Sequence, residues 1–595
     1  MLTIKNNGSI ITGVKTERVD VMKIVFKYLK PAYFKMVIAL IARMVAIVGE
    51  LSLPYILSHI LKNVILQESV EQICLWGFLM ILCSGVALVL SLFANRIVAG
   101  ISRDMSYAMR RDLFAKTLRL SAAQIDRFTI ASLESRITTD TYHVHNFVRM
   151  IQIAGIRGPV LLAGGLVITM IMDIHLSLVM FSVLPFVFAI VYFIRMKGIP
   201  LYTRVQKAVD NMVRIVREDA QGIRVIKALS KDKYEHKRYD EVNRALVREE
   251  EHANVIMGSV HPIMTLFMNM GIVAVVAVSA SRVANLQSDP ETIIVFMQYF
   301  TSISMAMMML TRLFVMTSKC SASAKRIEEV LMCEEELQVE DESKYPLGDE
   351  NVFVEFENVS FSYNGKKPDV EDINFKLYKG QSLGIIGATG SGKSTLVKLL
   401  LRFYDVDKGN VRINGRDIRT INREELYKMF GTAMQNDFLY ADTIEENINF
   451  GRNIHKEDII KAAKIAQAHD FISEFPEGYQ HMLSQKGTNV SGGQKQRILI
   501  SRAVAAGPEI LILDDSSSAL DYKTEANLRN ALEDAMKDTT VINVAQRVSA
   551  VKNCDLILVV DEGRIIGRGT HDELMETCEE YKEISDSQMG GAFVE

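Results

Sequence analysis

Cysteine is scarce in this chain of 595 residues, and the six cysteines show no pairing pattern. No two of them have C-x-x-C spacing, and no group of them has the spacing of a zinc ligand set, so neither a disulfide framework nor a structural zinc site is indicated. We therefore expect free thiols. The cysteines are Cys74, Cys83, Cys320, Cys333, Cys554 and Cys578.

Net charge is also small, at −3 from 68 basic and 71 acidic residues. This balance indicates no nucleic-acid partner. A cleavable signal peptide is not expected either, because the first stretch, MLTIKNNGSIITGVKTERVD, is polar and has no small-residue cleavage site. Apolar residues, in contrast, make up 49% of the chain. They form long runs up to about Met316, whereas the chain after Val352 alternates like a soluble α/β protein.

The first half contains six windows apolar and long enough to cross a membrane, which requires about 20 residues. A soluble protein would rarely carry so many, so we expect an α-helical membrane domain with six transmembrane helices. The windows are Phe34–Leu57, Ile73–Asn95, Ala154–Met172, Leu176–Met196, Val255–Val283 and Thr292–Met316.

The connections between these windows alternate in length and charge. Two are long and rich in arginine and lysine, at about residues 96–149 and 197–253, and three are short and poor in positive charge. Positive residues stay on the cytoplasmic side, so we expect the long connections and both termini to face the cytoplasm, with the protein in the plasma membrane. Each long connection is interpreted as helical extensions with a bend, at Ser121–Thr129 and at Val216–Val225.

Two charged residues fall inside the first predicted span. Arg43 and Glu50 are seven residues apart and so share a helical face. An intramembrane charge usually faces the interior of a helix bundle or a wet cavity. Two interpretations stay open, a structural pair that packs the first helix and a functional pair.

A phosphate-binding loop follows an acidic linker at 333–351. The sequence SLGIIGATGSGKSTLVKLLL begins as a strand and opens a helix, and it contains the G-x-x-x-x-G-K-S pattern whose backbone N–H groups surround phosphate oxygens. Lys393 is expected to reach the β and γ phosphates of ATP, and the Ser394 hydroxyl to ligate Mg²⁺. The loop residues predicted to bind the nucleotide are Gly387, Ala388, Thr389, Gly390, Ser391, Gly392, Lys393, Ser394 and Thr395.

Two further motifs belong to the same chemistry. Asp514 ends the apolar strand ILIL and is expected to hold Mg²⁺. The stretch NVSGGQKQRILISRAV opens a helix, whose N-terminus is a second anion site. Two such sites for one ATP are redundant unless the second one serves an ATP held by another nucleotide domain. The residues of this second motif are Ser491, Gly492, Gly493 and Gln494.

With these motifs in place, the chain resembles an ABC exporter half-transporter, in which six spanning helices precede an α/β P-loop ATPase domain. The resemblance covers about Val21 to Ser585, and its most specific parts are GATGSGKST and the signature VSGGQ, Val490–Gln494. The domains implied are an N-terminal tail at 1–20, a transmembrane domain at 21–332, the linker, a nucleotide-binding domain at 352–585 and a C-terminal tail at 586–595.

The resemblance also assigns roles outside the phosphate loop. It implies that Tyr363 stacks on adenine and that Gln435 touches Mg²⁺ and senses the membrane half. Ser518–Asp521, SALD, would run along the seam between two nucleotide domains. The two predicted bends would be coupling helices that enter grooves in those domains, one of them in the partner subunit.

The sequence departs from the family pattern at two positions. The acid after the magnesium aspartate is usually Glu, which polarises the attacking water, and here it is Asp515. Its carboxylate reaches less far by about 1.5 Å, one carbon–carbon bond. The family's switch histidine is replaced by Gln546, which cannot carry positive charge near the γ phosphate.

Because the residues that only bind ATP are intact, these two departures indicate a site that binds ATP but hydrolyses it poorly. The signature is also intact, so it can complete a competent site on a second half-transporter that has Glu and His at the matching positions. We therefore predict one subunit of a heterodimeric, ATP-driven, multidrug-type exporter of amphipathic compounds. The alternatives are a peptide or lipid exporter and a regulatory membrane protein that uses ATP as a ligand without transport.

Overall fold

The computed structural model describes residues 23–64, 70–285, 291–334, 337–435 and 437–589. The chain divides into two compact units, one made of residues 1–118 and 129–333 and the other of residues 119–128 and 334–595. We call these the membrane unit and the ATPase unit. The predicted N-terminal tail, 1–20, and the last six residues of the predicted C-terminal tail lie outside the described residues.

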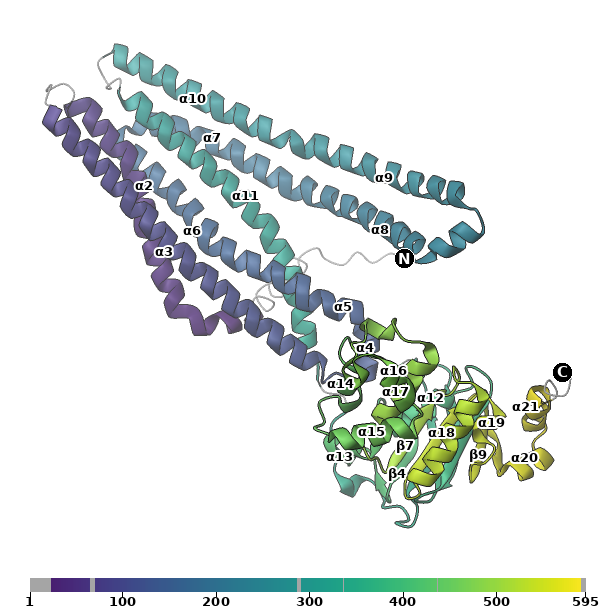
Figure 1. Ribbon diagram of the computed structural model, residues 1–595. Helices are drawn as coiled ribbons and strands as arrows, with labels where there is room; N and C mark the ends of the chain where they lie inside the picture. Colours follow the sequence, from purple (N-terminus) through teal and green to yellow (C-terminus); the bar gives the residue numbers. More distant parts are fainter. Residues whose placement is uncertain (1–22, 65–69, 286–290, 335–336, 436, 590–595) are drawn as a thin grey trace, which may run out of the picture. The chain divides into compact units, whose positions relative to one another are not determined.

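The membrane unit is helical throughout its described residues (Figure 1). Its long helices are α2 (Tyr33–His59), α3 (Val70–Thr117), α6 (Thr141–Met172), α7 (Ile174–Phe193), α8 (Ile199–Ala228), α9 (Asp232–Gly258), α10 (Val260–Ala284) and α11 (Glu291–Leu331). Short helical turns join them at Lys30–Ala32, Ile60–Val64, α5 (Ile130–Ser135), Arg136–Asp140 and Ile194–Gly198.

The apolar windows lie on these helices. By length and composition, four stretches of the described residues could cross a membrane, and a fifth, Ile174–Ile190, is apolar but shorter. The sixth predicted span is covered by α11, which is helical but is not among them. The four are Lys23–Val64, Val70–Thr117, Ile130–Met172 and Asp232–Ala284. The helical membrane domain is thus confirmed.

One predicted bend is in place and the other is wrong. The chain turns after α3 into the short helix α4 (Ala122–Phe128), within the predicted Ser121–Thr129. The stretch Val216–Val225, in contrast, lies inside the continuous helix α8. It has no proline, and a single glycine is tolerated in a helix. The turn comes later, where Ser230 has a left-handed φ of 51° and the acidic first turn of α9 follows.

The charged residues of the first span pair with neighbouring helices rather than with each other. Arg43 is buried on α2, and its guanidinium donates to the Asn95 side chain on α3. Glu50 accepts from Arg157 on α6 at 2.5 Å. Both contacts therefore join α2 to other helices of the bundle, and Arg157 is a partner that the sequence analysis did not identify.

The ATPase unit contains two sheets. The strands of the first are β1 (Val354–Phe361), β2 (Val370–Leu377), β4 (Lys408–Ile413) and β5 (Arg416–Asp417), antiparallel in the order β2-β1-β4-β5. The strands of the second are β3 (Ser382–Ile386), β6 (Phe430–Ala433), β7 (Ile510–Asp514), β8 (Thr540–Ala545), β9 (Leu556–Asp561) and β10 (Arg564–Gly569), in the order β10-β9-β3-β8-β7-β6.

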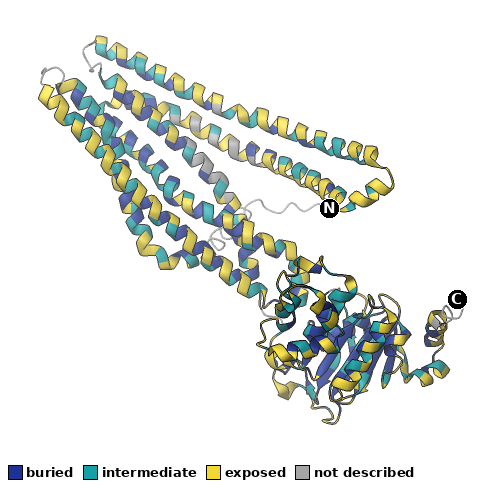
Figure 2. Cartoon of the chain, in the orientation of Figure 1, coloured by how far each residue is buried: buried dark blue, intermediate teal, exposed yellow. Residues whose placement is uncertain are grey.

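Helices cover the second sheet, whose strands are parallel except for the edge strand β10. Parallel strands are covered on both faces and so are apolar along their whole length, as ILIL in β7 is, where every residue is buried (Figure 2). The α-helices between residues 334 and 589 are α12 (Lys393–Leu400), α13 (Arg423–Lys428), α14 (Ile444–Asn449), α15 (Lys456–Ile465), α16 (His469–Glu474), α17 (Gly492–Val504), α18 (Tyr522–Ala535), α19 (Val548–Val551), α20 (His571–Thr577) and α21 (Glu579–Met589).

Candidate functional site

The candidate site forms where four parallel strands end. Strands β3, β8, β7 and β6 are neighbours in the sheet, so the residues that follow them meet at one edge. Ligands of open parallel sheets bind at this carboxyl edge. The predicted phosphate loop follows β3, Asp515 follows β7, Gln546 follows β8, and Gln435 comes two residues after β6. A cleft at this edge is lined by residues from all four segments.

The phosphate loop requires glycine at its two ends. A Cβ at Gly387 would lie 2.0 Å from the Val560 carbonyl oxygen, which no side chain can tolerate. Gly392 has a φ of 104° and forms the N-terminal cap of α12. Close backbone approach and left-handed φ both favour glycine, which has no Cβ. The loop thereby exposes its N–H groups and the start of α12 to an anion.

Lys393 lies inside this loop. Its Nζ donates to the carbonyl oxygens of Gly387 and Ala388, at 2.8 and 2.7 Å. Burial lowers the pKa of Lys393, while the nearby carboxylates of Asp514 and Asp515 act in the opposite direction. A phosphate within reach would restore a charged partner to this ammonium group. The buried Ser391 Oγ has no hydrogen-bond partner among the described residues, which also suits a loop shaped around a bound anion.

The residues predicted to hold Mg²⁺ provide the hard oxygen ligands that this ion prefers. The Ser394 hydroxyl donates to Oδ1 of Asp514 at 3.2 Å, so the two side chains are already in contact. Asp514 is 2% exposed, and burial raises its pKa. A divalent cation here would offset the cost of burying that charge. The donor set therefore fits Mg²⁺.

Two glutamine amides converge on Asp515. Nε2 of Gln435 donates to its Oδ2 at 3.1 Å, and Nε2 of Gln546 donates to the same oxygen at 3.4 Å. The Asp515 backbone is left-handed, with a φ of 51°, which aspartate tolerates better than most residues. The two positions that depart from the family pattern are thus in direct contact, and Gln435 contacts the same carboxylate oxygen through its amide nitrogen.

Tyr363, expected at adenine, lies in a group of aromatic rings. Its ring packs edge-on against Phe361 and Tyr404, and its hydroxyl donates to Oγ1 of Thr395 at 3.4 Å. Tyr404 in turn donates to Oδ2 of Asp126 on α4 at 2.6 Å. The predicted coupling segment Ser121–Thr129 therefore contacts the side chain next to the predicted adenine residue. Burial, together with Asp126, raises the pKa of Tyr404.

The signature residues form the start of α17. Ser491 caps the helix by accepting from the Gln494 N–H at 3.2 Å, and Oε1 of Gln494 accepts from the Ser491 N–H at 2.9 Å. A Cβ at Gly493 would lie 3.1 Å from the Ala519 carbonyl oxygen, so the signature packs tightly on the predicted seam segment. These residues do not appear among the described residues that line the phosphate cleft of the same chain.

The structure thus brings together the phosphate loop, Asp514, Asp515, Gln435 and Gln546, and it leaves the signature apart. Asp369 also lines the cleft, although it was not predicted, and it accepts from the Tyr363 N–H at 2.9 Å. It lies between β1 and β2, in a turn that matches no nucleotide motif. No sequence signal marked it.

Comparison with known proteins places the chain in a family. Residues 36–307 match the model of the ABC transporter transmembrane region, and residues 370–518 match the ABC transporter model. The chain is 32% identical to the uncharacterized ABC transporter ATP-binding protein YfiB of Bacillus subtilis over 571 residues, 96% of this chain and 99% of that protein. It is 30% identical to the putative ABC transporter ATP-binding protein exp8 of Streptococcus pneumoniae, over 97% and 98% of the two chains.

A solved structure has the same fold. The structure of a bacterial Atm1-family ABC exporter with ATP bound superposes with a TM-score of 0.78 and covers 93% of this chain and 98% of that one, at 22% identity. Sequence and fold agree on the order of the two parts, a helical membrane part followed by an α/β ATPase part. The chain belongs to the ABC transporter family and is an exporter half-transporter, with a transmembrane domain fused to a nucleotide-binding domain.

Proposed function

We propose that this half-transporter is the hydrolysis-impaired subunit of a heterodimeric exporter that moves amphipathic compounds out of the cytoplasm. The observation that carries the proposal is the contact of Gln435 and Gln546 with one oxygen of Asp515. At the position where the family pattern has Glu, a shorter acid is held by two amides, one of them from the residue that replaces the switch histidine.

The residues that bind ATP keep their roles in this proposal. The phosphate-loop N–H groups and Lys393 hold the phosphates, Tyr363 stacks on adenine, and Ser394, Asp514 and Gln435 hold Mg²⁺. When bound, Mg²⁺ neutralises charge on the phosphate oxygens. The carboxylate of Asp515 ends about 1.5 Å short of where a glutamate carboxylate would position water, and Gln546 brings an amide in place of an imidazole. The nucleotide is therefore bound but turned over slowly.

The signature and the surface of the membrane unit both support the presence of a second chain. Ser491 and the N–H groups of Gly492 and Gly493 would bind the γ phosphate of an ATP on the partner's phosphate loop. The helix α8 exposes large apolar side chains along its length in the single chain (Figure 2). Such a surface favours a protein or lipid partner. The exposed side chains of α8 include Tyr202, Val213, Val216, Ile223 and Val225.

The proposed substrate is amphipathic because the membrane unit combines apolar and charged groups. Met180, Met268, Met307 and Phe300 line a small apolar pocket, and methionine adapts to varied ligands. The Glu50–Arg157 pair, whose side chains are 44% and 37% exposed, adds polar groups to the bundle. The arginine-rich extensions support a cytoplasmic ATPase unit and a location in the plasma membrane.

The test compares one substitution in each of the two subunits, measured on the purified complex in lipid nanodiscs. Glu→Gln at the catalytic glutamate of the copurifying half-transporter should abolish ATP hydrolysis and substrate efflux, since it removes the one competent acid. Asp515→Asn should leave at least a third of the turnover. Equal losses from the two changes would show equivalent sites and contradict the proposal.

A further inference from the structure

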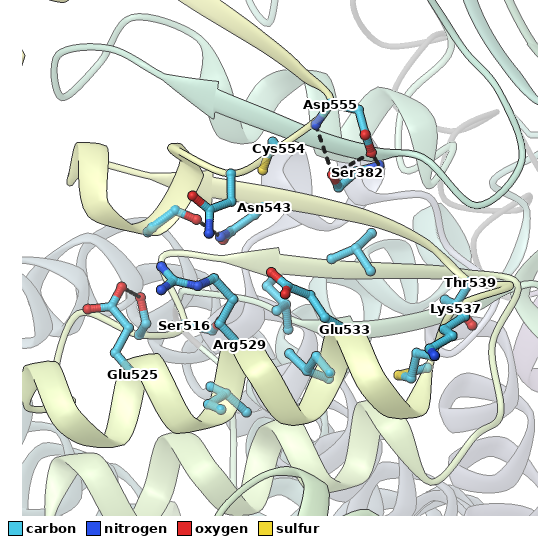
Figure 3. A pocket seen from close by; sticks show the side chains of 18 of the residues that line it. Ser382, Ser516, Glu525, Arg529, Glu533, Lys537, Thr539, Asn543, Cys554 and Asp555 are labelled. Carbon is cyan, nitrogen blue, oxygen red and sulfur yellow. Dashed lines mark hydrogen bonds between the residues drawn. The ribbon is translucent and has the colours of Figure 1, made fainter. Parts of the chain in front are cut away.

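A second cavity lies in the ATPase unit, between α18 and the six-stranded sheet (Figure 3). We call it the α18 cavity. Its volume is about 360 Å³, within the range of small-molecule sites. The helix forms one wall, the strands β7 and β8 form the other, and Ala550 and the loop residues 553–555 also line the cavity. Its apolar side chains include Leu513, Leu528, Leu532, Met536 and Val541.

The polar end of this cavity contains a buried carboxylate. Glu525 is 6% exposed, and its Oε1 accepts from the Ser517 hydroxyl at 3.1 Å. Its Oε2 is buried and has no hydrogen-bond partner among the described residues. The guanidinium of Arg547 is 3.9 Å from this oxygen, which is an ion pair but too long for a hydrogen bond. Burying a carboxylate oxygen without a hydrogen bond lowers the stability of the fold.

A buried donor lies one helical turn further along α18. Arg529 donates through Nη1 to the Ser549 carbonyl oxygen at 2.9 Å, but its Nε is buried without a partner among the described residues. Residues four apart share one face of a helix, and Figure 3 shows Glu525 and Arg529 on the face of α18 turned toward the strand that carries Asn543. The polar wall of the cavity thus contains one buried acceptor and one buried donor that lack hydrogen-bond partners among the described residues, beside an apolar surface.

We propose that the α18 cavity is a binding site for a small neutral molecule, apolar over most of its surface and bearing one carboxamide. The carboxamide N–H₂ would donate to Glu525, and its oxygen would accept from Arg529. The lining carries charges of both signs, and a neutral group that can both donate and accept is therefore the complementary choice. The acidic residues are Glu525, Glu533 and Asp555, and the basic ones are Arg529 and Lys537. The apolar part would lie against the leucines and Met536.

Such a ligand would act on ATP turnover, and this part of the inference rests on the proposed function. Ser516 and Ser517 line the cavity and directly follow Asp515 in the chain. The helix α18 begins at Tyr522, after the seam segment that ends at Asp521. Glu525 contacts Ser517 and is paired with Arg547, the neighbour of Gln546. Binding would therefore hold the two loops that flank the candidate catalytic positions.

The test uses the full chain in lipid nanodiscs and three probes that share one ring system. Calorimetric titration compares 2-naphthamide, 2-naphthoate and 2-(aminomethyl)naphthalene, with empty nanodiscs as the blank for partition into lipid. We expect one saturable site per chain for 2-naphthamide, with at least tenfold tighter binding than for either charged analogue. Arg529→Met should weaken the binding of 2-naphthamide tenfold to a hundredfold, as the loss of a hydrogen bond to a charged group predicts.

Two further variants complete the design. Leu532→Phe places extra volume in the cavity and should also weaken binding, whereas Asp534→Asn, on the same helix but outside the cavity lining, should leave it unchanged. Absence of saturable binding would mean that the cavity holds only water, and tighter binding of a charged probe would mean that the ligand class is wrong. Unchanged binding by Arg529→Met would place the site elsewhere. Each of these results overturns the inference on binding data alone. Because ATPase rates are not used, a failure of the proposed function can be distinguished from a failure of this inference.

Discussion

Restoring the family residues at the two altered positions should restore hydrolysis to this subunit. The change is Asp515→Glu together with Gln546→His. One added methylene extends the carboxylate by about 1.5 Å, and a misplacement of about 1 Å costs on the order of 100-fold in rate. That factor corresponds to about 2.7 kcal/mol in the activation free energy.

The contacts of Asp515 predict how the two changes combine. Its Oδ2 accepts from Gln435 at 3.1 Å and from Gln546 at 3.4 Å. A longer acid must move away from at least one of these amides. Asp515→Glu alone should therefore raise the rate by about tenfold, because Gln546 still occupies the place of the imidazole. The double variant should raise the rate by about 100-fold, the full factor expected from correcting the position of the carboxylate.

The assay is phosphate release by the purified full chain in nanodiscs at saturating Mg-ATP, after light scattering has identified particles with two copies. Asp538→Glu, which makes the same extension at an exposed turn, is the matched control and should not change the rate. The reasoning is refuted if the unmodified chain hydrolyses ATP as fast as the double variant. It is also refuted if the double variant binds ATP equally well and shows no gain.

Three further predictions concern the same unit. In the heterodimer, Ser491→Arg should abolish turnover at the partner's site while Lys393→Ala leaves part of it, as measured by phosphate release; the reverse order would contradict the composite site. Because burial raises the pKa of Asp514, its folded pKa lies above the unfolded one, so the stability linked to its protonated form is present at low pH and lost as pH rises through the folded pKa. Asp514→Asn should then raise the unfolding midpoint of the nucleotide-free protein by about 2 °C at pH 8 and much less at pH 4, and Mg²⁺ should no longer add to the stabilisation by ATP; equal shifts at both pH values would contradict this. Tyr404→Phe removes the hydrogen bond to Asp126 and should lower substrate-stimulated ATPase at least threefold while basal ATPase stays within twofold; equal losses in both would indicate a structural role.

Local patterns predicted the large features because each of them has a short-range cause. The run ILIL before Asp514 is apolar throughout because β7 is buried on both faces of the sheet, and the glycines of the phosphate loop are required by its backbone. The bend predicted at Val216–Val225 is wrong because the local sequence there does not decide between two structures. Its polar residues and single glycine are compatible with both a turn and an exposed helix, and the helix continued to Ala228.

Contacts across the fold could not be predicted from spacing. Arg43 and Glu50 share a helical face, yet each pairs with another helix, through Asn95 and Arg157. Asp126 and Tyr404 are 278 residues apart in the chain and meet through a 2.6 Å hydrogen bond. The convergence of Gln435 and Gln546 on Asp515 depends on the strand order β8-β7-β6, which periodicity does not reveal.

The strand order also explains how binding and turnover can be separated in one site. The groups proposed to cradle the phosphates come from the loop after β3, whose glycines and Lys393 are held by their own backbone. The groups proposed to position water come from the ends of β7 and β8, as side chains alone. Substitution at Asp515 and Gln546 therefore leaves the phosphate loop and the Ser394–Asp514 contact unchanged. A half-transporter can lose hydrolysis through two side chains, keep its ATP, and still offer an intact signature to its partner.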